Sequence, residues 1–340
     1  MITHKNVITY TTWFVNAFKI TKDNIFGNQT PFNFSMSVTD FYGALLSGAE
    51  LDIIPKSYFS FPIQLVTYLN DRHINTIYWV LSVFSIIKYY QLFDYILPKY
   101  LKLVLFAGEV MQLPWLNYFR SKIPEAEYAN LFGPTETTDI CTYYVVNRDF
   151  KDNDVLPIGK TCEGLDVFLL NDQHQRIKEP NQKGEMYVSG PFVSEGYYQD
   201  KVRTAKTFVS DPSKETPCIC YKSGDCCYYN DLGGLMFASR IDFQIKHLGY
   251  RIELGEIESN VLMIDGIMNA VCVYDSITDS IILFYTGKTK EDALNKELSS
   301  KVPHYMMPAV IKKEAILKTN PNGKIDRKYY QSNINTLINE

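Results

Sequence analysis

The stretch Asn130-Leu-Phe-Gly-Pro-Thr-Glu-Thr-Thr138 is the most informative segment of this 340-residue chain. It follows a predicted strand at 127–131 and combines a glycine–proline turn with hydroxyls, one carboxylate and an aromatic ring. An aromatic ring beside a tight turn can stack on a purine, and a carboxylate with hydroxyls can hold Mg2+ against phosphate oxygens. The segment is equally compatible with a capped turn in which Thr135 begins a short helix. Taken alone, it leaves both interpretations open.

Short apolar runs alternate with helical patterns around this segment, which implies βαβ units and a largely parallel sheet. The expected strands are 51–54, 76–80, 101–106 and 127–131, with helices at 41–46, 63–70 and 111–122. From about Asp166 onward, turn signals separate strands without intervening helices, which indicates antiparallel structure beside the first sheet. These strands are expected at 166–170, 185–189, 226–230 and 235–238.

After Arg240 the pattern changes again, to a helix at 253–263 with Leu254, Ile257 and Val261 on one side. Strands at 270–274, 281–285 and 309–314 and a helix at 290–300 complete about 100 residues, enough for a separate small domain. The predicted fold class is therefore α/β. A large domain at 1–240 holds mixed βαβ sheets and an antiparallel region, and a hinge joins it to a smaller α+β domain at 241–340.

Composition and charge exclude several classes of function. Lys plus Arg number 34 against 38 for Asp plus Glu, and a net charge of −4 argues against a nucleic-acid partner, because phosphate neutralisation needs a basic excess. The longest apolar run, 74–87, contains polar residues and is shorter than the roughly 20 residues a membrane span requires. The first residues show no secretory signal pattern. We therefore expect a cytoplasmic protein without a membrane span.

Seven cysteines are an odd number, which disfavours a disulfide framework. Cys218, Cys220, Cys226 and Cys227 lie close together, but their spacing differs from the paired C-x2-C of zinc ribbons. We favour buried free thiols over a metal site there. The five histidines are scattered without ligand spacing and receive no catalytic role.

Six further motifs follow the opening segment along the chain. They are Pro157-Ile-Gly-Lys160, Gly184-Glu185 with Gly196-Tyr197, Ser223-Gly-Asp225 followed by Ser239-Arg-Ile-Asp-Phe-Gln-Ile-Lys246, Gly249-Tyr-Arg-Ile-Glu-Leu-Gly-Glu-Ile-Glu258, Val302-Pro-His-Tyr-Met-Met-Pro308 and Asn320-Pro-Asn-Gly-Lys-Ile-Asp-Arg327. In this order and spacing they resemble the adenylate-forming superfamily, specifically amino-acid adenylation domains of nonribosomal peptide synthetases and D-alanine–carrier-protein ligases. The resemblance runs from Ile2 to about Arg327.

The resemblance implies a two-step reaction with ATP and Mg2+ as cofactors. A carboxylate attacks the α-phosphate of ATP to give an acyl-adenylate and pyrophosphate, and a carrier-protein phosphopantetheine thiol then takes the acyl group as a thioester. Such chemistry depends on positioning and charge neutralisation. The implied partners are an amino acid or related carboxylic acid and a carrier protein. Because no phosphopantetheine attachment sequence follows Arg327, the carrier would act in trans.

The resemblance assigns nucleotide contacts to the opening segment. Phe132 would stack on adenine, and Gly133 belongs to the same nucleotide-binding turn. Thr135 would contact the α-phosphate, while Glu136 would hold Mg2+.

The later motifs receive roles in the same way. Asp225 would bind the ribose hydroxyls, since a carboxylate accepts from two vicinal donors, and Arg240 would assist there. Asp242 matches the hinge, and Gly249 would let the pantetheine arm pass close to the backbone. Lys324 matches the lysine that bridges the substrate carboxylate and phosphate, although by itself it reads as a solvated lysine in a turn.

Asp242 and the GPTETT form resemble carrier-loading adenylators, whereas many acyl-CoA synthetases carry lysine at the hinge. An acyl-CoA synthetase-like ligase is therefore the less favoured enzymatic alternative. Motifs at 106–110 and 190–197 are closer to the D-alanine ligases.

The family's Ser/Thr/Gly-rich phosphate loop should precede Ile2, and it is not in the sequence. Its amides and lysine would neutralise the pyrophosphate end of ATP. We therefore expect the chain to be incomplete and weakly active or inactive alone. A separate N-terminal polypeptide, a truncation, or a non-catalytic remnant that binds a partner would each account for this.

The acid pocket departs from the family at Ser35, where the family has an aspartate that pairs with the substrate's α-ammonium. A hydroxyl cannot neutralise an ammonium, and a buried unpaired charge costs several kcal/mol. Asp139, which would line the pocket, either takes over this contact for a β-amino or otherwise displaced amine, or serves another contact because the substrate has no amine there. Both readings stay open. The other expected pocket residues are Met36, Thr39, Tyr78, Leu105, Ala107, Leu131 and Ile140.

Overall fold

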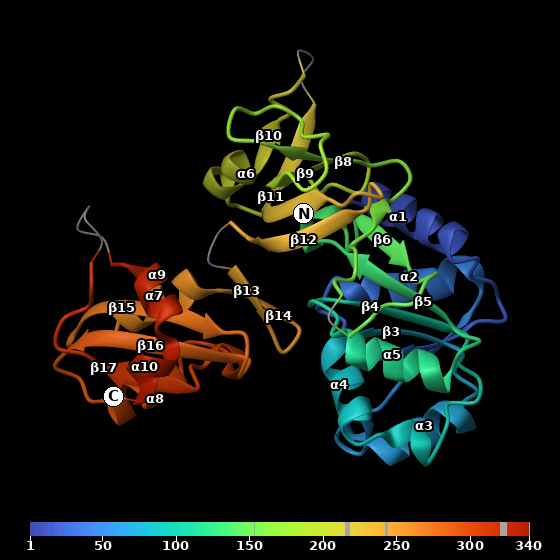
Figure 1. Ribbon diagram of the computed structural model, residues 1–340, viewed down its shortest axis with the longest axis horizontal. Helices are drawn as coiled ribbons and strands as arrows, with labels where there is room; N and C mark the ends of the chain where they lie inside the picture. The colour runs from blue at the N-terminus through green and yellow to red at the C-terminus, as the bar shows by residue number, and fades with distance from the viewer. Residues whose placement is uncertain (153, 215–217, 242–243, 320–324, 340) are drawn as a thin grey trace. The chain divides into compact units, whose positions relative to one another are not determined.

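The computed structural model describes residues 1–152, 154–214, 218–241, 244–319 and 325–339. It divides into two compact units, Met1–Ile241 and Asp242–Glu340 (Figure 1). Each unit has its own sheets and its own buried clusters.

The first unit is built on a seven-stranded sheet with the order β2-β1-β3-β4-β5-β6-β7. Neighbours from β2 to β5 pair in parallel, whereas β6 and β7 continue the sheet antiparallel. The mixed sheet agrees with the predicted fold class. The strands are β1 (Ile25–Asn28), β2 (Glu50–Ile53), β3 (Thr76–Val80), β4 (Leu103–Ala107), β5 (Glu127–Phe132), β6 (Thr142–Val145) and β7 (Lys160–Thr161).

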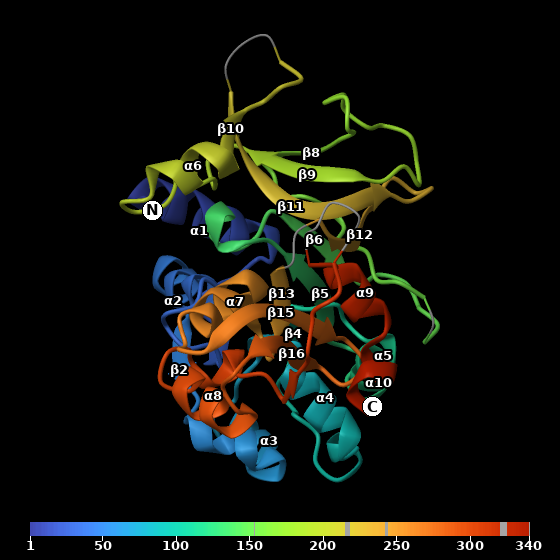
Figure 2. The same cartoon turned by 90° about the vertical axis from the view of Figure 1, so that its left-hand side faces the viewer.

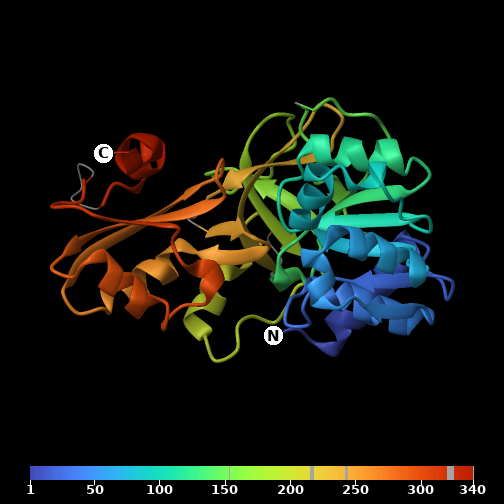
Figure 3. The ribbon, with the colours of Figure 1, turned by 90° about the horizontal axis from the view of Figure 1, so that it is seen from below.

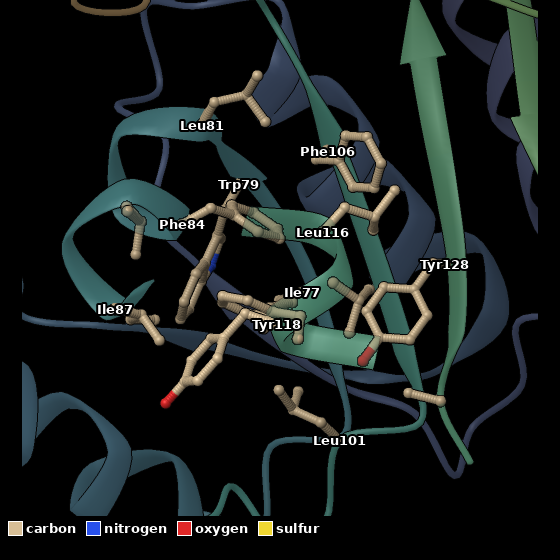
Figure 4. Packing of buried hydrophobic residues seen from close by; sticks show 14 of the residues in the cluster. Ile77, Trp79, Leu81, Phe84, Ile87, Leu101, Phe106, Leu116, Tyr118 and Tyr128 are labelled. Carbon is tan, nitrogen blue, oxygen red and sulfur yellow. The ribbon is translucent and has the colours of Figure 1, made fainter. Parts of the chain in front are cut away.

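Helices cover both faces of this sheet, because alternate strand residues point to opposite sides. Ile77 and Trp79 of β3 pack with one set of helices, and Tyr78 packs with the other. Figure 1 shows α4 and α5 on one side of β3 and β4 and α2 on the other, and Figure 4 shows the aromatic packing between β3, β4, α4 and α5. The helices are α1 (His4–Ala17) and α2 (Met36–Ser47) on one face, and α3 (Pro62–Asp71), α4 (Leu81–Tyr89) and α5 (Leu113–Lys122) on the other.

Several elements were not predicted from the sequence. The strand predicted at 76–80 is β3, but the helix α4 that follows it in the run at 74–87 was not predicted; Val80 takes an extended conformation as the N-cap of α4. Helix α1 begins with a capping box in which Thr3 and Asn6 bond each other's backbone, and its buried face includes Tyr10 and Phe14. Tertiary packing on both sides of the sheet decides these elements, and short apolar runs do not distinguish strand from helix.

A second, antiparallel sheet completes the first unit, as predicted, with order β10-β11-β9-β8 and β12 paired to β11 (Figure 2). Strand β11 is longer than the predicted 226–230 and carries a bulge between Lys222 and Cys226, where Gly224 has a φ of +73°. The bulge changes the register around Asp225. The elements are β8 (Asp166–Leu170), β9 (Gly184–Ser189), α6 (Lys201–Thr207), β10 (Phe208–Ser210), β11 (Ile219–Tyr229) and β12 (Leu235–Arg240).

The second unit contains a hairpin and a three-stranded sheet, β15-β16-β17, with helices on both faces. One buried cluster lies under α7 and α8, and the other lies under α9 and α10; Figure 3 shows the C-terminal helices on one side of these strands. The elements are β13 (Gln244–His247), β14 (Tyr250–Glu253), α7 (Leu254–Leu262), β15 (Ile267–Asp275), β16 (Ser280–Gly287), α8 (Glu291–Leu298), β17 (Val310–Lys313), α9 (Arg327–Ser332) and α10 (Ile334–Asn339).

Two findings bear on the classes considered above. No helix within the described ranges is long and apolar enough to cross a bilayer. All seven cysteines are free, and the described residues form no group of three or more His, Cys, Asp or Glu side chains that could hold a metal ion.

Candidate active site

The opening segment forms a tight reversal between β5 and β6. After Phe132 the chain passes through a 3-10 turn at Thr135–Thr137 (η3), and Thr138 adopts a left-handed conformation with φ of +70°. A Cβ atom on Gly133 would lie 2.4 Å from the Ile140 Cα atom and 2.6 Å from the Asp139 carbonyl oxygen. Glycine is therefore required, because the two limbs of the loop touch through their backbones. The loop presents its polar side chains at the end of β5.

Phe132, Asp225 and Arg240 are placed by strands that meet on one side of this loop. The half-buried Phe132 ring packs against Phe237 of β12, with 5.8 Å between ring centroids. Asp225 of β11 lies opposite Arg240 of β12, and the Arg240 Nη1 donates to the Asp225 carboxylate at 2.7 Å. Arg240 also donates to the Ser223 carbonyl at 2.8 Å. The guanidinium thus fixes the orientation of a buried carboxylate beside an aromatic ring.

Glu136 is buried and receives a hydrogen bond from the Tyr197 hydroxyl at 2.5 Å. Its backbone carbonyl accepts from the Ser194 amide at 2.8 Å, which ties the loop to the segment after β9. Mg2+ in nucleotide sites commonly uses one or two carboxylates together with phosphate oxygens and waters. A single carboxylate held in this way fits such an ion.

Asp139 lies at the centre of a buried polar cluster. Its Oδ2 atom accepts hydrogen bonds from Thr39 Oγ1 at 2.6 Å and from the Tyr10 and Tyr78 hydroxyls at 3.2 Å each. Burial raises the pKa of Asp139 to about 6, although hydrogen bonds from these hydroxyls and from Ser35 oppose the shift. The Thr135 hydroxyl of the Gly-Pro-Thr-Glu turn donates to Ser35 Oγ at 3.2 Å, and Ser35 lies near enough to Asp139 to lower the pKa of that carboxyl group.

The apolar pocket candidates come together around this cluster. Tyr78, Leu105, Ala107, Leu131 and Ile140 belong to one buried cluster on the α1/α2 face of the sheet, and Met36 packs against it. The structure therefore groups the expected pocket residues from four segments of the chain, together with Ser35, Thr39 and Asp139.

The second unit holds three further candidates. Gly249 lies in the turn between β13 and β14 with a φ of +81°, and the preceding Leu248 has a φ of +52°, a pair of values typical of a two-residue hairpin turn. Asp242 and Lys324 lie outside the described residues.

Three residues of the site carry no role in the sequence analysis. Tyr10 lies on α1, a helix that was not predicted from the sequence. Its aromatic neighbours Trp13 and Phe14 are also buried, so the pattern around Tyr10 is typical of a hydrophobic core. Tyr197 stands in the quoted Gly196-Tyr197 motif, which could have drawn attention to it. Asp40 follows Thr39 on α2 and is buried; Asn28 Nδ2 donates to its Oδ2 at 2.9 Å, and its Oδ1 has no hydrogen-bond partner.

A sequence profile of the family described as AMP-binding enzyme matches residues 1–198. The chain belongs to this family. The D-alanine--D-alanyl carrier protein ligase of Bacillus cytotoxicus is 31% identical over 345 residues, which cover 98% of this chain and 67% of that ligase. The Bacillus licheniformis ligase of the same name is 30% identical over 346 residues, which cover 96% of this chain and 66% of that ligase. The chain thus spans about two thirds of the length of these relatives.

Solved structures agree with membership of the AMP-binding family. IdnL1 superposes with a TM-score of 0.84 and 25% identity over 93% of this chain and 66% of that one. Holo-PA1221, a nonribosomal peptide synthetase protein with adenylation and PCP domains, superposes with a TM-score of 0.78 and 27% identity. The match covers 91% of this chain and 53% of that one. The resemblance to adenylate-forming ligases and the predicted fold class are confirmed.

Proposed function

We propose that this chain carries the acid-binding and adenosine-binding parts of a ligase that activates an amino acid or related carboxylic acid with ATP. The observation that carries the proposal is the arrangement around one loop. Phe132 of the Gly-Pro-Thr-Glu segment packs on Phe237 of β12, the strand that also carries Arg240 opposite Asp225, and Thr135 of the same segment bonds to Ser35 near the Asp139 cluster. An adenosine and an acid bound at these places would meet at Thr135.

In the first step, an oxygen of the substrate carboxylate forms a bond to the α-phosphorus of ATP, and the bond to the departing pyrophosphate breaks. In the second, the sulfur of a carrier-protein phosphopantetheine bonds to the acyl carbon. The bond from that carbon to AMP breaks, and the thiol proton passes to solvent. The curated relatives are named as D-alanine–carrier protein ligases, and the proposal assigns this chain to the same reaction class.

The residues of this chain would act by binding and positioning. Phe132 stacks on the adenine, and Asp225 accepts from the ribose hydroxyls while Arg240 holds its carboxylate in place. Thr135 donates to the α-phosphate, and Glu136 would hold Mg2+. When bound, that ion supplies positive charge against the phosphate oxygens. Gly249, Asp242 and Lys324 keep their proposed roles in the pantetheine path, the hinge and the carboxylate–phosphate bridge.

Nucleotide binding provides the direct test. We expect AMP to bind the 340-residue chain in isothermal titration calorimetry, and Asp225→Asn to weaken that binding at least ten-fold. Asp166→Asn is the matched control, because Asp166 also pairs with an arginine of the first unit, Arg176, at 2.9 Å. AMP affinity that is the same in Asp225→Asn and the wild-type chain would contradict the proposal.

Catalysis is a second readout. Because the chain spans about two thirds of the length of its curated relatives, we expect the 340 residues alone to show little acid-dependent exchange of pyrophosphate into ATP. Exchange comparable to a full-length relative would refute this expectation. If exchange appears when a polypeptide supplying the phosphate loop is added, thioester formation on a carrier protein rather than on free coenzyme A distinguishes the proposal from an acyl-CoA synthetase. AMP binding without any exchange in that mixture would favour the non-catalytic remnant.

A further inference from the structure

Two buried carboxyl groups lie near each other behind the Gly-Pro-Thr-Glu turn. Asp139 is 3% exposed and Asp40 is 1% exposed, and each comes from a different segment. Hydroxyls of Tyr10 on α1, Thr39 on α2 and Tyr78 on β3 donate to Asp139, and the Ser35 hydroxyl at the start of α2 lies near enough to lower the pKa of Asp139. All four groups are uncharged.

Asp40 leaves an acceptor unused. Its Oδ2 receives the Asn28 amide at 2.9 Å, and its Oδ1 is buried without a partner. Within the described parts of the chain, no lysine, arginine or histidine forms an ion pair with either carboxyl group. An unused buried acceptor and a buried carboxylate without a counter-ion each cost free energy, and a bound cation would lower both costs.

The charge of the pair fits a single cation. Burial raises the pKa of Asp40 to about 8, and the nearby Asp139 charge adds to the shift. Burial raises the pKa of Asp139 to about 6. At neutral pH the pair therefore carries one negative charge, located on Asp139, while Asp40 keeps its proton.

The position of Asp139 relative to Thr135 and Ser35 determines how far the substrate's amine lies from its reacting carboxyl group. Thr135, assigned above to the reacting phosphate, bonds to Ser35 at 3.2 Å, and Ser35 lies near enough to Asp139 to lower the pKa of that carboxyl group. An amine on the carbon next to the reacting carboxyl group would lie beside Ser35, which offers no charge. An amine one carbon further along would reach Asp139.

We infer that Asp139 binds the ammonium group of the substrate and that the activated acid is a β-amino acid. This inference rests on the proposed function and names its substrate class. Asp40, which keeps its proton, acts behind Asp139 as a positioning residue, and the hydroxyls of Tyr10, Thr39 and Tyr78 hold the Asp139 carboxylate in place.

Ligand-observed NMR titrations of the 340-residue chain test the inference without ATP. The probes are 3-aminobutanoate, 2-aminobutanoate and butanoate, which share the same carbon chain. We expect 3-aminobutanoate to bind at least ten-fold more tightly than either of the others. Asp139→Asn should remove this preference while butanoate affinity changes less than two-fold. Asp94→Asn, at an exposed site paired with Lys122, is the matched control and should keep the preference.

Ser35→Asp is the second variant, for the case that Asp139→Asn does not fold. It places a carboxylate one position nearer the reacting centre, so we expect the preference to move toward 2-aminobutanoate. Butanoate binding as tightly as 3-aminobutanoate, a preference that survives Asp139→Asn, or an unchanged preference in Ser35→Asp would overturn the inference. AMP binding separates the two proposals: if AMP binds and the amine preference is absent, the substrate class is wrong and the adenosine site stands.

Discussion

At the scale of single residues, the site contains acids in two kinds of surroundings. Asp225 faces the Arg240 guanidinium at 2.7 Å, whereas Asp139 and Asp40 face hydroxyls, an amide and each other. The first arrangement pairs a buried carboxylate with a positive charge. The second makes protonation sensitive to burial and to a bound cation, because desolvation disfavours the charged form.

Asp40 should make the stability of the first unit depend on pH. With a pKa of about 8 in the folded chain and about 4 in the unfolded chain, the folded state holds one more proton between these values. The free energy of unfolding therefore falls as pH rises from about 4 to 8. Asp40→Asn should flatten this slope, measured by urea denaturation at pH 5.5 and 8.5. Tryptophan fluorescence reports the first unit, because Trp13, Trp79 and Trp115 all lie there. An unchanged slope would show that Asp40 does not titrate in this window.

Amine binding at Asp139 should weaken in acid. As pH falls through about 6, Asp139 takes up a proton and loses the charge that attracts an ammonium. The other titratable groups facing it are Asp40, Tyr10, Tyr78 and Cys162; the pKa values of Tyr10, Tyr78 and Cys162 lie well above their usual values, and Asp40 is protonated throughout this range. We expect 3-aminobutanoate to lose roughly ten-fold in affinity between pH 7.5 and pH 5, while butanoate follows a different profile. Equal profiles for the two probes would argue against a charged contact.

At the scale of elements, the reversal between β5 and β6 carries the candidate residues of the Gly-Pro-Thr-Glu segment together with Asp139 and Ile140. It fits because Gly133 lets the backbone approach residues 139–141, and because the Cys141 amide donates to the Phe132 carbonyl at 2.9 Å. The same reversal carries Thr135 and Glu136 in its 3-10 turn and the buried Asp139 three residues after Glu136. A change in this loop should therefore affect both stability and ligand binding.

Gly133→Ala should destabilise the first unit by about 3 kcal/mol, the upper end for overpacking, because the new Cβ meets backbone that cannot move aside. Gly255→Ala is the matched control. A Cβ there has nothing within 4 Å, and Gly255 lies in the first turn of α7, so that variant should gain about 0.5 kcal/mol. Urea denaturation followed by circular dichroism measures both. Equal stability of the two variants would disprove the tight backbone contact.

At the scale of the whole molecule, the two units bury separate sets of side chains. The clusters under α7 and α8 and under α9 and α10 draw all their members from the second unit. A unit that buries its own apolar face does not need its neighbour for a core. Such independence is what a small domain that moves during a reaction cycle requires.

The fragment 242–340 should therefore fold alone. We expect a dispersed amide NMR spectrum and a cooperative thermal transition. The matched comparison is the same fragment with Leu283→Asp, which puts a charge into its fully buried cluster and should abolish the transition. A disordered wild-type fragment would contradict the independence of the second unit.

Sequence motifs alone were enough to predict the family, the α/β class and the candidate site residues. These predictions follow from motifs such as Gly-Pro-Thr-Glu and Ser-Gly-Asp, which are local, and from the alternation of strands and helices. The structure added the helices α1 and α4 and the unpredicted residues Tyr10, Asp40 and Tyr197. Their roles arise from side chains that are distant in sequence and meet across a sheet. Burial then raises the pKa of Asp40, an aspartate on helix α2, to about 8. Neither this burial nor the contacts between distant segments can be recognised from a local sequence pattern.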